Sequence, residues 1–203
     1  MKLYYAPGTC AVAVWIALEW LGADYDVEKV DPHSADFKKL NPLGKVPVLE
    51  TDDGDVKTEL APILNYLVEK YPEADLGPED DIESRFRFGE WEAFLTGDFH
   101  PAFGAMFHPE NFTEKDGEED IEAVKKAAYK NIAKVMEHLD EKLDGRLHIY
   151  KDKKTVLDPY AYILTRWSAM TPKSWREYSN IKKFMENMGA APEVKRILQE
   201  SAQ

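Results

Sequence analysis

The spacing of apolar positions changes several times along this chain. Residues 2–5 are apolar after Lys2 and lead to a break at Pro7-Gly8, and residues 10–21 are apolar at almost every position until Glu19. The first run is typical of a buried strand, whereas the second predicts a helix that is covered on more than one side. Gly22 then ends that helix, because glycine favours a helix C-terminus.

The next two stretches predict a second strand and a short helix. Residues 25–30 alternate well enough for a strand, and Ser34 is a plausible N-cap for a helix whose apolar residues are Phe37 and Leu40. The order up to this point is β-α-β. Because a helical crossover joins parallel strands, we expect the first two strands to lie side by side.

A turn at residues 41–45 leads to a third strand at 46–50, with Pro47 at its head. Residues 52–55 predict a hairpin turn into a fourth strand at 56–58, and a helix follows from Thr58 or Glu59 to Lys70. Since proline has no N–H to donate, Pro47 predicts a sheet edge, a strand start or a cis turn. Free backbone groups beside it would pair with a peptide ligand by strand addition.

The second part of the chain predicts only helices. Residues 71–81 are rich in proline, glycine and acid, which is typical of a linker. Apolar residues then recur at helical spacing over 82–99 and 121–143, and further helices are expected at 156–167, 180–188 and 192–199. The domains predicted are therefore residues 1–74, a linker at 75–81 and an all-helical domain at 82–203.

The single cysteine stands at the expected start of the first long helix. Unpaired backbone N–H groups and the helix dipole favour a thiolate there, and the same groups attract anionic ligands. The alternative is that Cys10 is an ordinary buried residue, because free cysteine is among the most buried residue types. One cysteine forms no intramolecular disulfide, so packing must hold the fold.

Composition narrows the classes of function. The net charge is −12, and residues 1–80 carry 7 Lys/Arg against 16 Asp/Glu, which supports a division into two domains. An acidic chain without a basic cluster disfavours nucleic acid and anionic membranes as partners. The five histidines lack ligand spacing, so no metal site is predicted. No apolar run is long enough for a membrane span or a signal-peptide core, which predicts a cytoplasmic protein.

Several motifs together resemble those of one family. They are Tyr5-Ala-Pro-Gly-Thr-Cys10, Asn41-Pro-Leu-Gly-Lys-Val-Pro-Val48, Thr58-Glu59 before a helix, Glu90-Trp91, His100 and Thr155-x-x-Asp158. In this order and spacing they resemble a cytosolic glutathione transferase, most similar to the beta class. The resemblance implies a thioredoxin-like N-terminal domain of order βαβαββα, an all-helical C-terminal domain and a homodimer.

The resemblance also implies the site. Glutathione, the co-substrate, would contact Tyr5, Thr9, Cys10, Lys45, Val46, Pro47, Glu59, Leu60 and His100. Cys10 and His100 would act on its sulfur as catalytic residues, Val46 would exchange main-chain hydrogen bonds with its cysteinyl part, and Glu59 would hold its γ-glutamyl end. Leu60 stands where the family usually has serine or glycine, which leaves only its backbone N–H for that contact. Phe103, Phe107 and Trp167 are the candidates for a pocket that takes a small hydrophobic electrophile.

Two chemistries and one different class of function stay open. Bound glutathione thiolate would attack an electrophile, or Cys10 would itself be the nucleophile in thiol-disulfide exchange and deglutathionylation. The alternative is a non-catalytic binding or dimerisation module of the same fold. Alternatively, Tyr5 and the aromatic residues Phe103, Phe107 and Trp167 are ordinary residues of the hydrophobic core. Thr155-x-x-Asp158 matches a capping box, which Pro159 is expected to distort.

Overall fold

The computed structural model describes all residues from Met1 to Gln203. Its first part is a four-stranded mixed sheet, with strands in the order β2-β1-β3-β4. β1 and β2 are parallel, and β1–β3 and β3–β4 are antiparallel. The strands are β1 (Lys2–Tyr5), β2 (Asp26–Lys29), β3 (Val48–Glu50) and β4 (Val56–Thr58). The predicted order of strands and helices in this domain is thus confirmed.

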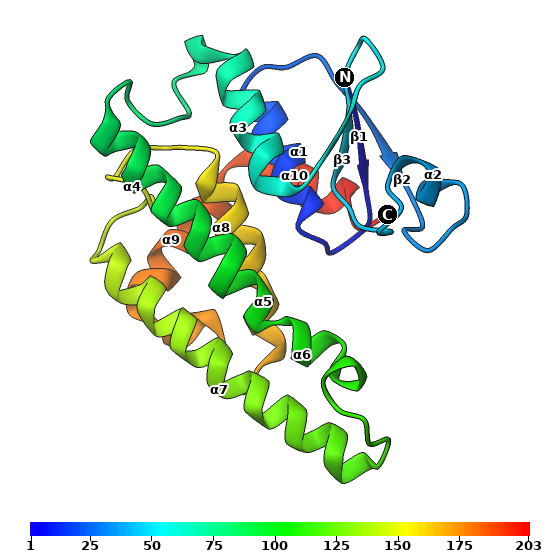
Figure 1. Cartoon of the computed structure of the whole chain (residues 1–203). Helices are drawn as coiled ribbons and strands as arrows, with labels where there is room; N and C mark the ends of the chain where they lie inside the picture. The colour runs from blue at the N-terminus through cyan, green and yellow to red at the C-terminus, as the bar shows by residue number, and fades with distance from the viewer.

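Helices make up the rest of the chain (Figure 1). The α-helices are α1 (Ala11–Trp20), α2 (Phe37–Leu40), α3 (Leu60–Lys70), α4 (Ile82–Ala93), α5 (His100–Ala102), α6 (Gly104–Phe107), α7 (Glu118–Leu143), α8 (Leu157–Arg166), α9 (Ser179–Ala190) and α10 (Pro192–Glu200). A wide π-helical turn, η2 (Phe94–Phe99), joins α4 to α5, and short 3₁₀ turns are η1 (Pro72–Ala74), η3 (Pro109–Phe112), η4 (Trp167–Met170) and η5 (Trp175–Glu177). No helix is both long and apolar enough to cross a lipid bilayer.

Helix α1 is the element around which the two parts pack. It contacts α3 of its own domain and α8 and α10 of the helical part, which is why residues 11–18 are all buried and why its sequence shows no polar face. The C-terminal helix returns to it through polar contacts as well. Trp20 donates to Glu193 at 3.0 Å, and Arg196 pairs with Glu19 at 2.6 Å. The first domain is therefore completed by the last helix of the chain.

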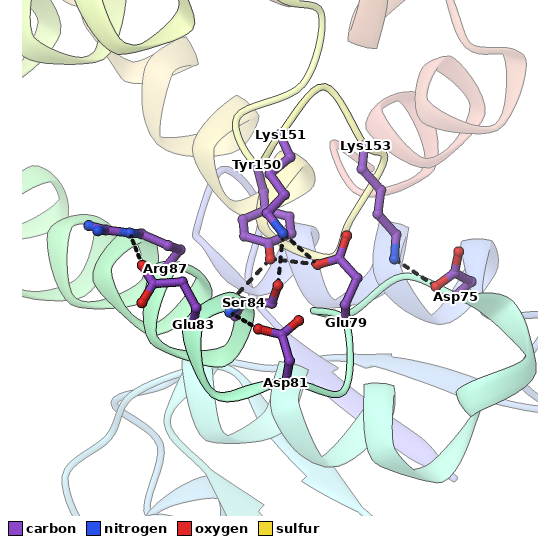
Figure 2. Close-up of polar contacts among 9 residues, drawn as sticks. All are labelled: Asp75, Glu79, Asp81, Glu83, Ser84, Arg87, Tyr150, Lys151 and Lys153. Carbon is purple, nitrogen blue, oxygen red and sulfur yellow. Dashed lines mark hydrogen bonds and ion pairs between the residues drawn. The ribbon is translucent and has the colours of Figure 1, made fainter.

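The segment predicted as a linker is not loosely held. Leu76 and Gly77 are buried, and the Leu76 carbonyl accepts from the Val156 N–H at 3.0 Å. Figure 2 shows how side chains of the loop before α8 fasten it: the Tyr150 hydroxyl donates to Glu79 at 2.8 Å, and Lys153 pairs with Asp75 at 2.6 Å. The expectation of a segment with little to pack was wrong, because its partners lie about 70 residues later in the chain. The domain limits themselves stay a prediction.

Gly77 gives a direct test of this packing. A Cβ added to Gly77 would overlap Cγ1 of Val68, a stiff β-branched side chain on α3. We expect Gly77→Ala to lower the free energy of unfolding by about 1–3 kcal/mol through overpacking. Gly97 in the η2 turn has open space around it, so Gly97→Ala should not lower the free energy of unfolding. Urea unfolding of both variants measures this, and equal effects would contradict it.

The apolar face of α4 differs from the predicted one. Phe88 and the N-terminal Ser84 are buried, whereas Ile82 and Phe86 are 85% and 58% exposed. Helical spacing alone did not separate the two faces, because both carry large apolar residues. Phe99 lies on the buried side as expected, after the π-helical turn has shifted the register.

The predicted capping box at the start of α8 is only half formed. The Thr155 N–H donates to Asp158 at 2.8 Å, but the Asp158 N–H donates to the Thr155 carbonyl rather than to its hydroxyl. The Thr155 hydroxyl is buried without a partner. Asp158 instead collects two further donors, His148 Nδ1 at 3.0 Å and the Ile149 N–H at 2.9 Å. The carboxylate therefore holds the loop before α8 as well as the helix start.

Candidate active site

The single cysteine lies between β1 and α1, immediately before the first helical residue. A turn closed by Thr9, whose hydroxyl donates to the Ala6 carbonyl at 2.7 Å, brings it there. Cys10 is 7% exposed, and its thiol donates to the Val46 carbonyl at 3.7 Å. Two segments that are 36 residues apart thus meet at one sulfur atom.

The helix start does not make this thiol acidic. The backbone N–H groups of Cys10 and Ala11 lower its pKa, as the helix argument expects, but burial outweighs them and raises the pKa to about 12. The negative charge of Glu59 raises it further. Cys10 is therefore a neutral hydrogen-bond donor near pH 7, and the expectation that its position favours thiolate was wrong. The first-turn dipole is weaker than the cost of burying a charge.

The state of Cys10 is testable by its reaction rate. We expect iodoacetamide to alkylate the folded chain slowly at pH 7–8, with a midpoint far above the value of about 8.5 for a free thiol. Because the chain has one cysteine, mass spectrometry reads this site alone. The same chain unfolded in urea is the control and should titrate near pH ~8.5. A folded-state midpoint at or below that of the control would contradict a buried, neutral thiol.

The loop before β3 presents the backbone at Val46. Asn41 shapes this loop, because its amide donates to the Lys45 carbonyl at 2.8 Å and its oxygen accepts from the Leu43 N–H at 3.2 Å. The Val46-Pro47 bond is cis, and Pro47 directly precedes β3. β3 lies inside the sheet between β1 and β4, so of the alternatives open for Pro47 the strand start and the cis turn are correct and the edge is wrong.

Glu59 stands at the head of α3 with an unusual backbone. Its φ of 67° and ψ of 126° are costly for a residue with a side chain, and such strain is concentrated at functional sites. The side chain is exposed, whereas Leu60 is 6% exposed. Pro62 removes one of the first N–H groups of the helix, and those of Leu60 and Ala61 have no intrahelical partner. This end of α3 offers a carboxylate and free N–H donors side by side.

A tyrosine that the sequence analysis missed holds His100. His100 Nδ1 lies 3.1 Å from the Tyr160 hydroxyl. This hydroxyl also donates to the Leu95 carbonyl at 3.5 Å. Burial, and then the charge of Lys45, lower the pKa of His100, so the ring is neutral near pH 7. Burial, Cys10 and Glu59 raise the pKa of Tyr160, so all three lie in one electrostatic environment.

Trp167 joins the helical part to the cysteine loop. Its indole N–H donates to the Gly8 carbonyl at 2.9 Å, and its ring centroid is 5.1 Å from that of His100. Phe107 packs edge-on against Trp167 at 5.3 Å and is 40% exposed. Phe103 also contacts Trp167, but it is fully buried. The open aromatic wall therefore consists of Phe107 and Trp167, with Phe103 behind them.

Comparison with known proteins agrees with this arrangement. Residues 8–70 match the family model described as the N-terminal domain of glutathione S-transferase. A glutathione S-transferase of Xanthomonas campestris pv. campestris, GST-4.5, is 31% identical over 202 residues, which cover 98% of each chain. The chain belongs to the glutathione S-transferase family. It is also similar in structure to a sphingomonad glutathione S-transferase complexed with glutathione, at 31% identity and a TM-score of 0.86 over 99% of this chain and 98% of that one.

The beta-class resemblance is confirmed by a second structure. A bacterial beta class glutathione S-transferase from Sphingomonas chungbukensis has the same 31% identity and a TM-score of 0.86, again over 99% of this chain and 98% of that one. The family fold, a thioredoxin-like domain followed by a helical domain, is thus the fold of this chain. The likeness to both proteins covers 99% of this chain.

The fold brings most of the predicted site residues to one place. Cys10 touches Val46, the charges of Glu59 and Lys45 act on Cys10 and His100, and Trp167 reaches the same loop. Tyr5 is 6% exposed, and its ring packs on Trp15 at 5.1 Å. Tyr160 lies in a helix that is buried at nearly every position, so no local pattern marks it. Tyr160 and His100 are 60 residues apart in the sequence, so no sequence motif links them.

Proposed function

We propose that this glutathione S-transferase binds glutathione between the Cys10 loop, Val46 and the head of α3. The contact between the Cys10 thiol and the Val46 carbonyl carries this proposal, because it places a thiol beside the half-buried backbone that leads into β3. The cysteinyl part of glutathione would take the main-chain groups of Val46. The γ-glutamyl carboxylate would accept hydrogen bonds from the first N–H groups of α3, and the γ-glutamyl ammonium would pair with Glu59.

The reaction that the site supports best is conjugation to a small electrophile. A neutral Cys10 thiol and the ring N–H of a neutral His100 are both donors, and donors stabilise the thiolate of bound glutathione. Glutathione loses its thiol proton to solvent, its sulfur forms a bond to the electrophilic carbon, and the leaving group departs with its electron pair. Phe107 and Trp167 would hold the apolar part of the electrophile. A thiol with a pKa of about 12 is a poor nucleophile, which disfavours Cys10-dependent disulfide exchange.

Variants at Cys10 distinguish the two chemistries. With glutathione and 1-chloro-2,4-dinitrobenzene, we expect Cys10→Ala to lower kcat/KM about tenfold, which is the loss of one donor to a charged sulfur. Cys10→Ser keeps a donor and should recover most of that activity. Exchange between glutathione and 2-hydroxyethyl disulfide should follow the same order. If both variants retain full conjugation and lose only exchange, Cys10 is the nucleophile and the proposal fails; absence of glutathione binding at millimolar concentration would also contradict it.

The homodimer expected from the resemblance is part of the proposal. Ile82 and Phe86 lie one turn apart on α4 and expose apolar surface that no other part of the chain covers. We propose that a second copy of the chain packs there. Light scattering should then give about twice the 23.3 kDa of one chain, and a monomer for Phe86→Glu; a monomeric wild type would contradict this.

A further inference from the structure

Tyr160 joins two points of the helical part beside the candidate active site. It lies on α8 and is 1% exposed, so it is shielded from bulk water. Its hydroxyl lies 3.1 Å from His100 Nδ1 and 3.5 Å from the Leu95 carbonyl. Leu95 is near the start of η2, and His100 directly follows that turn. One buried hydroxyl therefore meets both ends of the turn that carries His100.

The π-helical turn depends on the same carbonyl. The His100 backbone N–H donates to the Leu95 carbonyl, which is the hydrogen-bond pattern of a π-helix. Such turns are rare and occur frequently at functional sites. The Leu95 carbonyl thus accepts from the backbone of His100 and from the Tyr160 hydroxyl, which also meets the His100 ring. Tyr160 is therefore placed to hold both the backbone and the ring of His100.

The contact with Tyr160 is the one hydrogen bond of the His100 ring within the chain. The other contacts of the ring are aromatic, with centroids 5.1 Å from that of Trp167 and 6.1 Å from that of Tyr160. The torsion that turns an imidazole is broad and roughly two-fold, so packing of flat rings alone leaves two orientations. A hydrogen bond at Nδ1 selects one of them, and it leaves Nε2 as the ring nitrogen that is free for a ligand.

The Tyr160 hydroxyl keeps its proton over the whole working range of pH. Burial, and then the charges that Cys10 and Glu59 carry when ionised, raise the pKa of Tyr160 above its ordinary value. Burial, and then the charge of Lys45, lower the pKa of His100. A hydroxyl both donates and accepts, so it can hold Nδ1 whether or not that nitrogen carries the ring proton. Tyr160 is therefore a neutral partner for a neutral His100 near pH 7.

We propose that Tyr160 is a positioning residue for conjugation, whose hydroxyl holds the His100 ring with Nε2 toward the sulfur of bound glutathione. This role rests on the proposed function, in which the ring N–H of His100 stabilises the glutathione thiolate. Tyr160 acts through His100 and not on the sulfur itself. Without the hydroxyl the ring occupies both orientations, so its N–H faces the sulfur for only part of the time. Less of the bound glutathione is then ionised at a given pH.

Nuclear magnetic resonance of the ligand-free chain tests the pair itself. The ring nitrogens of all histidines are isotopically labelled, and His100→Ala identifies the signals of His100 among those of the five histidines. Tyr160→Phe removes only the hydroxyl. We expect it to shift or broaden the Nδ1 signal of His100 while the signals of the other histidines stay in place. An unchanged Nδ1 signal would overturn the proposal.

The pKa of bound glutathione, read from the ultraviolet absorbance of its thiolate, tests the role in the reaction. Tyr160→Phe should raise this pKa by about 0.5–1, because the donor to the thiolate is no longer held in place. Its kcat/KM with 1-chloro-2,4-dinitrobenzene should fall about three- to tenfold at neutral pH. The loss should fade at higher pH, where glutathione ionises without help.

Two further variants separate positioning from a general loss of structure. Adding Tyr160→Phe to His100→Ala should lower kcat/KM no further than His100→Ala alone, since Tyr160 acts through that ring. Tyr162→Phe removes a hydroxyl from the same helix and is the matched control. It should leave the pKa of bound glutathione and the pH profile of kcat/KM unchanged.

The outcomes distinguish a failure of this role from a failure of the proposed function. The role of Tyr160 is overturned if Tyr160→Phe and His100→Ala lower kcat/KM additively, or if Tyr160→Phe lowers it equally at every pH. It is also overturned if the wild type and Tyr160→Phe lower the pKa of bound glutathione equally, in which case the proposed function stands. A wild type that leaves that pKa at its solution value contradicts the proposed function, and this role with it.

Discussion

Replacing Asp158 by alanine should lower the free energy of unfolding by about 3–5 kcal/mol, one of the two largest effects that the structure predicts. The carboxylate is fully buried and accepts from His148 Nδ1 and from the N–H groups of Ile149 and Thr155. Alanine leaves all three donors without their acceptor, and the N–H groups of Ile149 and Thr155 are buried. Equilibrium unfolding in urea measures the loss.

The matched control is a carboxylate with the same kind of partner but in water. Asp81 caps α4 by accepting from the Ser84 N–H at 2.8 Å, and it is exposed. Asp81→Ala should cost only about 1 kcal/mol, the usual value for an N-cap. If the two alanine variants unfold at the same urea concentration, Asp158 does not act as a buried centre of hydrogen bonds.

The partner of Asp158 makes part of this stability depend on pH. The hydrogen bond to Asp158 raises the pKa of His148 above its usual 6.5. A group whose pKa is raised by folding stabilises the fold below its unfolded pKa, and this stability is lost as pH rises through the folded pKa. The contribution of His148 to the free energy of unfolding should therefore decline above about pH 6.5 in the wild type. His148→Ala should abolish this pH dependence.

Replacing Glu59 by glutamine should raise the Kd for glutathione about ten- to hundredfold, the other large effect, because a charged hydrogen bond to the ligand ammonium is lost while the shape is kept. Glu69→Gln, which changes an exposed glutamate near the other end of α3, is the control and should leave the Kd unchanged. Glutathione without its α-amino group should bind the wild type and the Glu59→Gln variant equally. If Glu59→Gln weakens that analogue as much as glutathione, the carboxylate acts on the fold and not on the ammonium.

The order of strands and helices could be read from the sequence because it depends on local periodicity. The signals used were the alternation at residues 25–30, the turn at 52–55, and the glycines and prolines that end helices and strands. Each of them acts within a few residues, and the sheet has the strand order that they indicate. The resemblance then added the function, which no single motif carried.

What the sequence could not give depends on contacts between distant segments. The helix-start N–H groups lower the pKa of Cys10 as the local argument predicts, but burial by distant segments raises it more, so the net direction could not be predicted locally. Tyr160 and Trp167 join the site through contacts with His100 and Gly8, 60 and 159 residues away. Likewise, the segment at 75–81 looked loose because its partners Tyr150 and Lys153 come much later.

A crystal structure of this chain soaked with glutathione tests the proposed binding site most directly. We expect the glutathione sulfur within hydrogen-bond distance of Cys10 Sγ, its cysteinyl main chain paired with Val46, and its γ-glutamyl end at Glu59 and the first N–H groups of α3. Glutathione bound elsewhere on the chain, or bound in the opposite direction with its sulfur away from Cys10, would contradict it.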